Sequence, residues 1–238
     1  MTWSIIARDP ATGDFGIAVA TRFFAVGARV PFVRSGVGAI ATQALVNSFY
    51  GVDGLRMLDE GRAPAEIVRV LTEADAGRAH RQVHIMNAAG EVAAHTGREC
   101  VDWCGHMQGE GFSVAGNMLA GAAVIEQTAA AYRREGTLPF PRRLIAALKA
   151  GEAAGGDKRG KQSAALVICG REAWPDLDLR VDDHADPLAE LTRLEAVSRE
   201  RFVHFRPFMP RRDNPSGIYD RGVIEAGIAE ALAREGQA

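Results

Sequence analysis

The sequence predicts an α+β fold in which two antiparallel sheets pack together and carry helices on their outer faces. Strand-like and helix-like segments occur in separate blocks, instead of the strict alternation that produces a parallel sheet. The first four strand-like segments are joined by short connections, which favour antiparallel neighbours. The strands are also rich in glycine and alanine, which suits close packing of one sheet on the other.

The predicted strands are short, apolar segments bounded by turn residues. Pro10 and Gly13 mark the turn of a first hairpin, and Gly90 marks the turn of a later one. We expect strands over residues 2–8, 15–20, 29–33, 37–42, 80–87, 91–96, 101–107, 112–115, 164–169 and 177–181.

The predicted helices show apolar residues spaced three and four apart. Gly61 is suited to a helix end and Pro64 to a first helical turn, and Asp186-Pro187 has the composition of a helix start. We expect helices over residues 54–61, 64–74, 121–135, 142–154, 187–201 and 223–234. Residues 1–185 should form one domain. Residues 186–238 should form a helical, proline-rich extension that packs on the domain or on a partner subunit.

The composition of the chain argues against some classes of binding partner. The 238 residues are 47% hydrophobic and 24% charged, with a formal charge of −2 and a pI near 6.3. These values argue against nucleic acid and anionic membranes as main partners. We find no apolar run long enough to span a membrane and no signal peptide. Three cysteines, an odd number, favour a reducing cytoplasm. We also predict that no cofactor is needed.

Thr2 is the first candidate for chemistry. Removal of Met1 would give Thr2 both a hydroxyl and a free α-amine. A hydroxyl needs an adjacent base to act as a nucleophile, and a terminal amine with an ordinary pKa of about 7.7–8.0 supplies one. Thr2 at the start of a strand therefore predicts a nucleophile that carries its own base.

Two other clusters contain side chains that could support metal or thiol chemistry. The segment 182–186 combines carboxylates with one imidazole, a donor set that suits hard cations. A strand exit followed by a helix cap explains this segment better. Cys100 and Cys104 lack the second ligand pair that a zinc site requires. We therefore predict no metal, and keep a thiol hydrolase built on Cys104 and His106 as a minor alternative.

Several longer motifs resemble a known bacterial family. The segments 2–9, 20–27, 41–44, 155–164 and 179–184 are similar to those of a family of uncharacterised proteins assigned to the N-terminal nucleophile (Ntn) hydrolase superfamily. The resemblance covers roughly residues 2–200. It implies a four-layer α-β-β-α sandwich, distantly similar to proteasome β-subunits. It also implies cleavage of an amide-type bond in a small molecule, although the family does not indicate which molecule is the substrate.

The proteasome-like resemblance carries over to single positions. Thr2 matches the nucleophilic threonine, and Gly116-Asn117 resembles the corner that assists the terminal amine. Asp157 resembles the aspartate that supports the same amine. Ala20 and Ala28 stand where proteasome β-subunits have their aspartate and lysine, so the lysine–aspartate pair is missing.

The resemblance also implies roles for the remaining candidates. Main-chain N–H groups at Thr42 and Gln43, together with Asn117, are expected to stabilise an oxyanion. Arg22 should recognise an anionic group of the substrate, and Thr21 and Arg159 are expected beside it. The alternative is a non-catalytic binding or assembly protein on the same scaffold. In either case we expect a homodimer.

Overall fold

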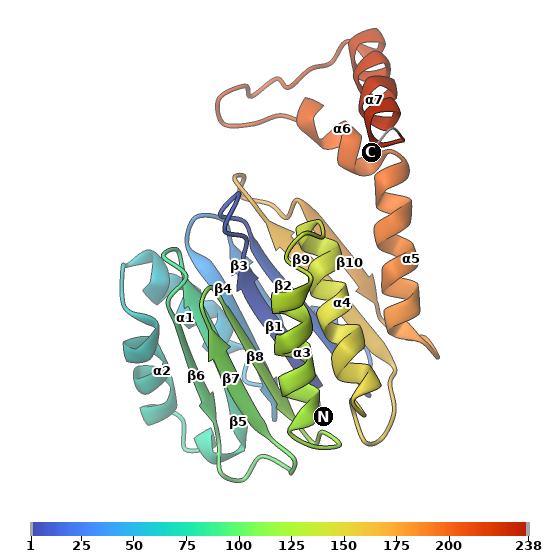
Figure 1. The fold of residues 1–238 in the computed structure, drawn as a ribbon. Coiled ribbons are helices and arrows are strands. Elements are labelled where there is room, and N and C mark those ends of the chain that lie inside the picture. The colour runs from blue at the N-terminus through green and yellow to red at the C-terminus, as the bar shows by residue number, and fades with distance from the viewer. Residues whose placement is uncertain (1, 237–238) are drawn as a thin grey trace. The chain divides into compact units, whose positions relative to one another are not determined.

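The computed structural model describes residues 2–236 and is drawn in Figure 1. The chain divides into two compact units, Met1–Leu191 and Thr192–Ala238. The sequence places the boundary about six residues earlier. The first turns of helix α5 (Pro187–Glu200) belong to the first unit, because Leu188 and Leu191 are buried.

The first unit contains two sheets in which every paired strand is antiparallel, as the sequence predicts. One sheet has six strands in the order β10-β9-β2-β1-β8-β7, and the other has four in the order β3-β4-β5-β6. The six-stranded sheet is formed by β1 (Thr2–Arg8), β2 (Phe15–Thr21), β7 (Gly105–Gly109), β8 (Phe112–Asn117), β9 (Ser163–Cys169) and β10 (Leu177–Val181). The four-stranded sheet is formed by β3 (Pro31–Arg34), β4 (Gly38–Ala44), β5 (Arg81–Asn87) and β6 (Val92–Thr96).

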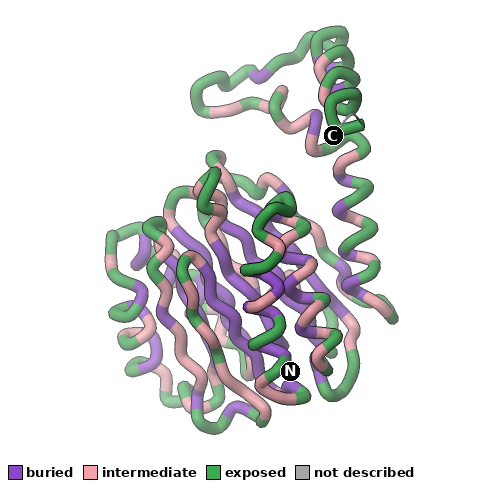
Figure 2. Tube along the Cα trace, viewed as in Figure 1, coloured by how far each residue is buried: buried purple, intermediate pink, exposed green. Residues whose placement is uncertain are grey.

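The main core lies between the two sheets. Ile6 and Ile17 of the six-stranded sheet pack in one cluster with Ala41 and Met86 of the four-stranded sheet. The central strands are buried along almost their whole length, as the purple segments of Figure 2 show. Strands buried on both faces require apolar side chains on both, which explains the near-continuous apolar sequence of β1 and β2.

Helices cover the outer faces of both sheets. Helices α3 (Ala123–Arg134) and α4 (Phe140–Ala153) contact the six-stranded sheet, and α1 (Phe49–Asp59) and α2 (Pro64–Glu73) contact the four-stranded sheet. Helix α1 begins five residues before its predicted start. Gly51 and Gly54 lie on its buried face, where a side chain would collide with Phe32 and Ile40.

Two predicted strands are also shifted. Residues 26–28 form a short 3-10 helix whose Val26 carbonyl accepts the N–H groups of Arg29 and Val30. These N–H groups cannot join a ladder, so β3 begins only at Pro31. The strand predicted over residues 101–107 is β7, which starts at Gly105, because the main chain at 101–103 bonds instead to Met118 and Leu119.

The second unit consists of the end of α5, a short helix α6 (Phe202–Phe205), a 3-10 turn (Arg206–Phe208) and helix α7 (Arg221–Glu235). Helix α7 starts two residues before its predicted start, because the Asp220 carboxylate caps it by accepting the N–H groups of Gly222 and Val223. Within the described chain, no helix is both long and apolar enough to cross a membrane.

Candidate functional site

One end of the gap between the sheets is lined by polar side chains, which we call the polar end. The register of β1 places Thr2 opposite Thr21 on one side and Asn117 on the other. In the facing sheet, Gln43 lies opposite Gln82. All five residues are at most 8% exposed. Buried polar groups are costly unless they are hydrogen-bonded, so a cluster of them at strand ends indicates a specific arrangement.

The Thr2 side chain faces the gap between the sheets. Side chains alternate along a strand, and Ile6, four residues later on the same face, belongs to the core between the sheets. The Thr2 Oγ1 atom lies 3.1 Å from Thr21 Oγ1, within hydrogen-bonding distance. The strand pairing therefore brings two hydroxyl groups from residues 19 positions apart to one point.

Two side-chain amides approach Thr2, that of Asn117 from the neighbouring strand β8 and that of Gln43 from β4 of the facing sheet. Gln43 Nε2 and Asn117 Nδ2 both donate to Gln82 Oε1, at 2.8 and 3.1 Å. The same nitrogens lie 3.4 and 3.5 Å from the Thr2 carbonyl oxygen, which is long for a hydrogen bond. Each amide therefore has one firmly bonded hydrogen and one that is only weakly engaged.

A buried chain of hydrogen bonds through Ser4, His84 and Ser113 holds the Gln43 amide. The Ser4 hydroxyl donates to Gln43 Oε1 at 2.6 Å, so its oxygen accepts from His84 Nε2 at 2.9 Å. His84 Nδ1 then accepts from the Ser113 hydroxyl at 3.1 Å. Burial, and secondarily the charge of His106, lowers the pKa of His84 to about 3. The ring is therefore neutral at pH 7 and holds the Gln43 side chain in one orientation.

Asp157 closes the end of β1. Its carboxylate accepts the Arg22 N–H at 2.8 Å, and its main chain forms a β-bridge with Leu119. Arg22 directly follows Thr21, and Leu119 comes two residues after Asn117. Asp157 is thus held between the extensions of the two strands that flank β1, immediately beyond Thr2.

The three charged candidates form one cluster around this carboxylate. Arg159 donates to Asp157 from its main chain at 2.8 Å and from its guanidinium at 3.3 Å. The Arg159 guanidinium also donates to the Arg22 carbonyl, and Arg22 donates to the Lys161 carbonyl. Both arginine side chains reach the surface, whereas Asp157 is buried. The cluster presents two cations on the rim of the polar end.

Thr42 does not offer the free N–H that was expected of it. Its N–H donates to the Val30 carbonyl at 3.2 Å, and its hydroxyl donates to the Asn47 carbonyl at 3.2 Å. The connection between β2 and β3 returns beside β4, and this supplies the acceptor that the sequence alone did not reveal.

Backbone strain also concentrates at the polar end. In the part of the chain that the structure describes, three residues other than glycine have positive φ, namely Ala25 (53°), Ala44 (68°) and Met118 (54°). Ala44 is the last residue of β4, Met118 directly follows β8, and Ala25 lies in the connection after β2; these strands contribute Gln43, Asn117 and Thr21. Such conformations cost about 1–3 kcal/mol each and persist where surrounding structure imposes them, often at functional sites.

Sequence reasoning missed Gln82 and His84, which complete the network. Both lie on β5, and both point into the gap between the sheets. The signal was available in the alternation Gln82-Val83-His84-Ile85, where polar residues recur every second position of a strand that is otherwise apolar.

The cysteines take part in a different set of contacts. Cys100 donates to the Arg81 carbonyl, and burial raises the pKa of Cys100 to about 11. Burial and the neighbouring Asp102 also raise the pKa of Cys104. The Cys104 thiol donates hydrogen bonds to the Cys100 carbonyl and the Asp102 carboxylate, and not to His106. A raised pKa leaves little thiolate, the reactive form, at pH 7. Among residues 2–236, no three His, Cys, Asp or Glu side chains converge as metal ligands.

Comparison with known proteins places the chain in a family. No functionally curated protein matches it. A crystal structure of a Silicibacter pomeroyi protein, assigned to the family DUF1028, is similar to it with a TM-score of 0.86 and 34% sequence identity. That similarity covers 93% of this chain and 96% of the other. Residues 2–191, the part of the chain that holds both sheets and the polar end, match the model of the same family. The chain therefore belongs to DUF1028, a family of unknown function.

Proposed function

We propose that this protein is an N-terminal nucleophile amidohydrolase that acts on a small amide-type substrate, with Thr2 as its nucleophile. The proposal includes the finer fold assignment, a four-layer α-β-β-α sandwich of the Ntn type. The observation that carries it is the position of the Thr2 hydroxyl, at the polar end of the gap between the sheets and 3.1 Å from Thr21 Oγ1.

The proposed reaction begins with attack of Thr2 Oγ1 on the substrate carbonyl. The Thr2 α-amine accepts the hydroxyl proton and passes it to the leaving amine as the C–N bond breaks. An ester between Thr2 and the acyl group results, and water then hydrolyses it. Met1 lies outside the described residues, so its removal remains a prediction on which this step depends.

Asn117 and Asp157 are assigned supporting roles. The weakly engaged Asn117 Nδ2 hydrogen is the donor that we assign to the oxyanion, in place of the Thr42 N–H. The Asp157 carboxylate has about four acceptor sites, and three donors from the described residues occupy it. The remaining site would accept the Thr2 ammonium.

The rim of the polar end indicates a substrate with an anionic group. The Arg159 guanidinium bonds to Asp157, and the Arg22 guanidinium donates to the Lys161 carbonyl. Guanidinium groups bind carboxylates bidentately. The cysteines form no disulfide in the described chain, which fits the proposed cytoplasmic location.

Two measurements on the purified protein test the mechanism. Intact mass of protein expressed in its native host reports whether Met1 is removed. A β-lactone probe then tests the nucleophile: attack by Thr2 opens the ring, forms an ester at Oγ1 and adds the whole mass of the probe. We expect labelling at Thr2 in the wild type and in Thr2→Ser, and none in Thr2→Ala. Thr12→Ala, at an exposed turn, is the matched control and should label normally.

A non-catalytic binding protein on the same scaffold is the second candidate. Ala20 and Ala28 favour it, because they replace the aspartate and lysine of the proteasome-like pattern. Retention of Met1 on most molecules would favour this candidate. Equal labelling of Thr2→Ala and the wild type would reject the nucleophile.

A further inference from the structure

A hollow of about 510 Å³ lies beside the end of β6, on the first unit of the chain. Its walls come from the turn after α2 and from the residues that end β6. Arg78, His95 and Arg98 contribute two guanidinium groups and one imidazole to the lining, and none of the lining residues is acidic. A hollow with basic walls attracts anions.

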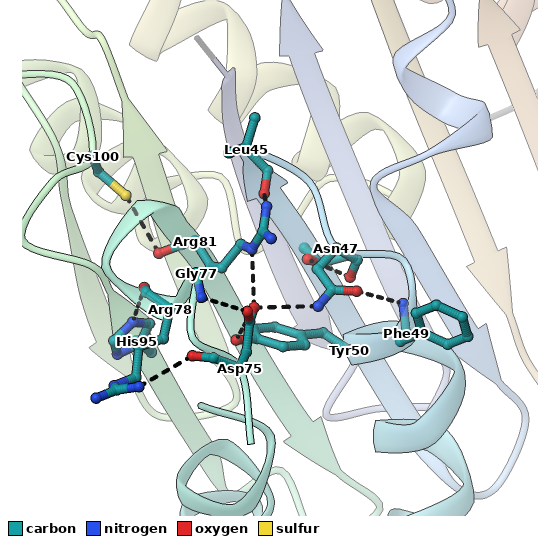
Figure 3. A network of polar contacts seen from close by, with 11 residues as sticks. Leu45, Asn47, Phe49, Tyr50, Asp75, Gly77, Arg78, Arg81, His95 and Cys100 are labelled. Carbon is teal, nitrogen blue, oxygen red and sulfur yellow. Dashed lines mark hydrogen bonds and ion pairs between the residues drawn. The ribbon is translucent and has the colours of Figure 1, made fainter. Parts of the chain in front are cut away.

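The partly buried carboxylate of Asp75 is paired with Arg81 and not with Arg78. Figure 3 shows Asp75 at the centre of a polar network, in which its carboxylate accepts from Arg81, the Gly77 N–H, Tyr50 and Asn47 at 2.7–3.3 Å. Burial alone would raise the pKa of Asp75, but these hydrogen bonds, with Arg81 first, lower it to about 2. The charge of Asp75 is therefore matched by Arg81.

Among residues 2–236, the Arg78 guanidinium bonds to a neutral group and not to the Asp75 carboxylate. Its Nη1 donates to the main-chain carbonyl of Asp75 at 3.2 Å. Arg98 pairs with the Glu99 carboxylate at 3.6 Å within the described residues, and this pair is exposed. Exposed pairs of this kind contribute about 0–1 kcal/mol. Both guanidinium groups are thus available to a ligand.

Hydrogen bonds hold the main chain on both sides of the hollow. His95 Nε2 donates to the Arg78 carbonyl at 2.9 Å, as the left side of Figure 3 shows. The Gly97 N–H donates to the Arg81 carbonyl, and the Glu99 N–H donates to the Ala79 carbonyl. These bonds join the two walls of the hollow. The main chain around the hollow is therefore fixed, and a ligand would have to order only the exposed side chains of Arg78 and Arg98.

We propose that this hollow binds a phosphate-type dianion carried by a small molecule, with Arg78 and Arg98 as its main contacts. Two planar guanidinium groups can each bind a phosphate bidentately, and two positive charges match a dianion better than a monocarboxylate. The proposal does not depend on Thr2 or on the proposed hydrolase activity.

Thermal unfolding of the full-length protein with inorganic phosphate tests the site. The ionic strength is held constant with NaCl, because salt screens surface charge. We expect phosphate to raise the melting temperature saturably, as a ligand of the folded state does. Acetate at the same ionic strength should bind at least about tenfold more weakly.

Three variants locate the effect. Arg78→Gln and Arg98→Gln should each weaken phosphate binding by about tenfold, the loss expected for one charged hydrogen-bonding partner. Arg69→Gln is the matched control, since it removes the same charge from an exposed position on α2 that is paired with Glu73. It should bind phosphate as the wild type does. If Arg78→Gln fails to fold, Arg98→Gln decides the matter, because the Arg98 side chain is 87% exposed.

Three results would overturn the proposal. They are a shift that does not saturate, equal affinity for acetate and phosphate, and a loss in Arg69→Gln as large as that in Arg98→Gln. Each would mean that phosphate acts on the general charge of the surface and not in the hollow.

Discussion

The Asp157 carboxylate accepts the main-chain N–H of Arg22 at 2.8 Å, although the two residues are 135 positions apart in the chain. This bond fixes the 155–161 loop at the end of β2, next to Thr2. Because Asp157 is buried, the Arg22 N–H has no water to replace it. Loss of this contact would therefore destabilise the domain and also displace the loop that lies beside Thr2.

Asp157→Ala should lower the free energy of unfolding by about 3 kcal/mol, because hydrogen bonds to charged groups contribute about 1.5–3 kcal/mol and a buried N–H is left unpaired. Urea unfolding at pH 7 measures this change. Arg159→Gln is the control, since it leaves the Arg22 N–H bond intact, and it should cost less than about 1 kcal/mol. Equal losses in the two variants would assign the effect to the surface ion pair.

His84 should make the protein less stable as the pH falls. Its folded pKa of about 3 lies below the ordinary value of 6.5, because burial and secondarily the charge of His106 disfavour the protonated ring. Between these two pKa values the unfolded chain binds a proton that the folded chain does not. Stability from this group is therefore complete above pH 6.5 and falls by about 1.4 kcal/mol per pH unit down to pH 3. Urea unfolding from pH 7 to pH 4 should show a shallower slope in His84→Gln, and parallel slopes would contradict the assignment.

Asp75→Asn should destabilise the protein by about 2–4 kcal/mol at pH 7, because it removes one partner from a largely buried ion pair. The folded pKa of Asp75 is lowered to about 2 from 3.8, so its contribution is present above pH 3.8 and is lost as the pH falls through 2. This interval lies mostly below the one assigned to His84. Chemical denaturation measures the loss at pH 7, and Glu73→Gln on the surface of α2 should change stability by less than about 0.5 kcal/mol.

Thr21→Val should slow β-lactone labelling of Thr2 by about tenfold while leaving the fold intact. Valine keeps the shape of threonine but removes the hydroxyl that lies 3.1 Å from Thr2 Oγ1, and a neutral hydrogen bond contributes about 0.5–1.5 kcal/mol. Labelling rates followed by mass spectrometry give the comparison. Thr21→Ser retains the hydroxyl and should label at close to the wild-type rate. A valine variant as fast as the wild type would remove Thr21 from the site.

The helix and strand boundaries show where sequence patterns are sufficient and where they fail. The strands around Ile6 and Ile17 are mostly apolar, and the sequence locates them within one or two residues. Helix α1 starts earlier than predicted because Gly51, which weakens a helix in isolation, is the residue that lets it pack against Phe32. The packing partner decides such a position, and it lies outside any local window.

The sequence by itself determined the fold class and the order of strands and helices along the chain, because these follow from local periodicity. It suggested Thr2 from its place behind Met1, and it suggested Asn117 and Asp157 through the resemblance to proteasome β-subunits. Only the tertiary structure decided which polar groups meet. It joined Thr2 to Thr21, assigned the Thr42 N–H to Val30 and revealed Gln82 and His84 beneath the candidate nucleophile. Hydrogen bonds between strands and between sheets depend on register and on facing surfaces. Those relationships are fixed only when segments far apart in the chain pack against each other.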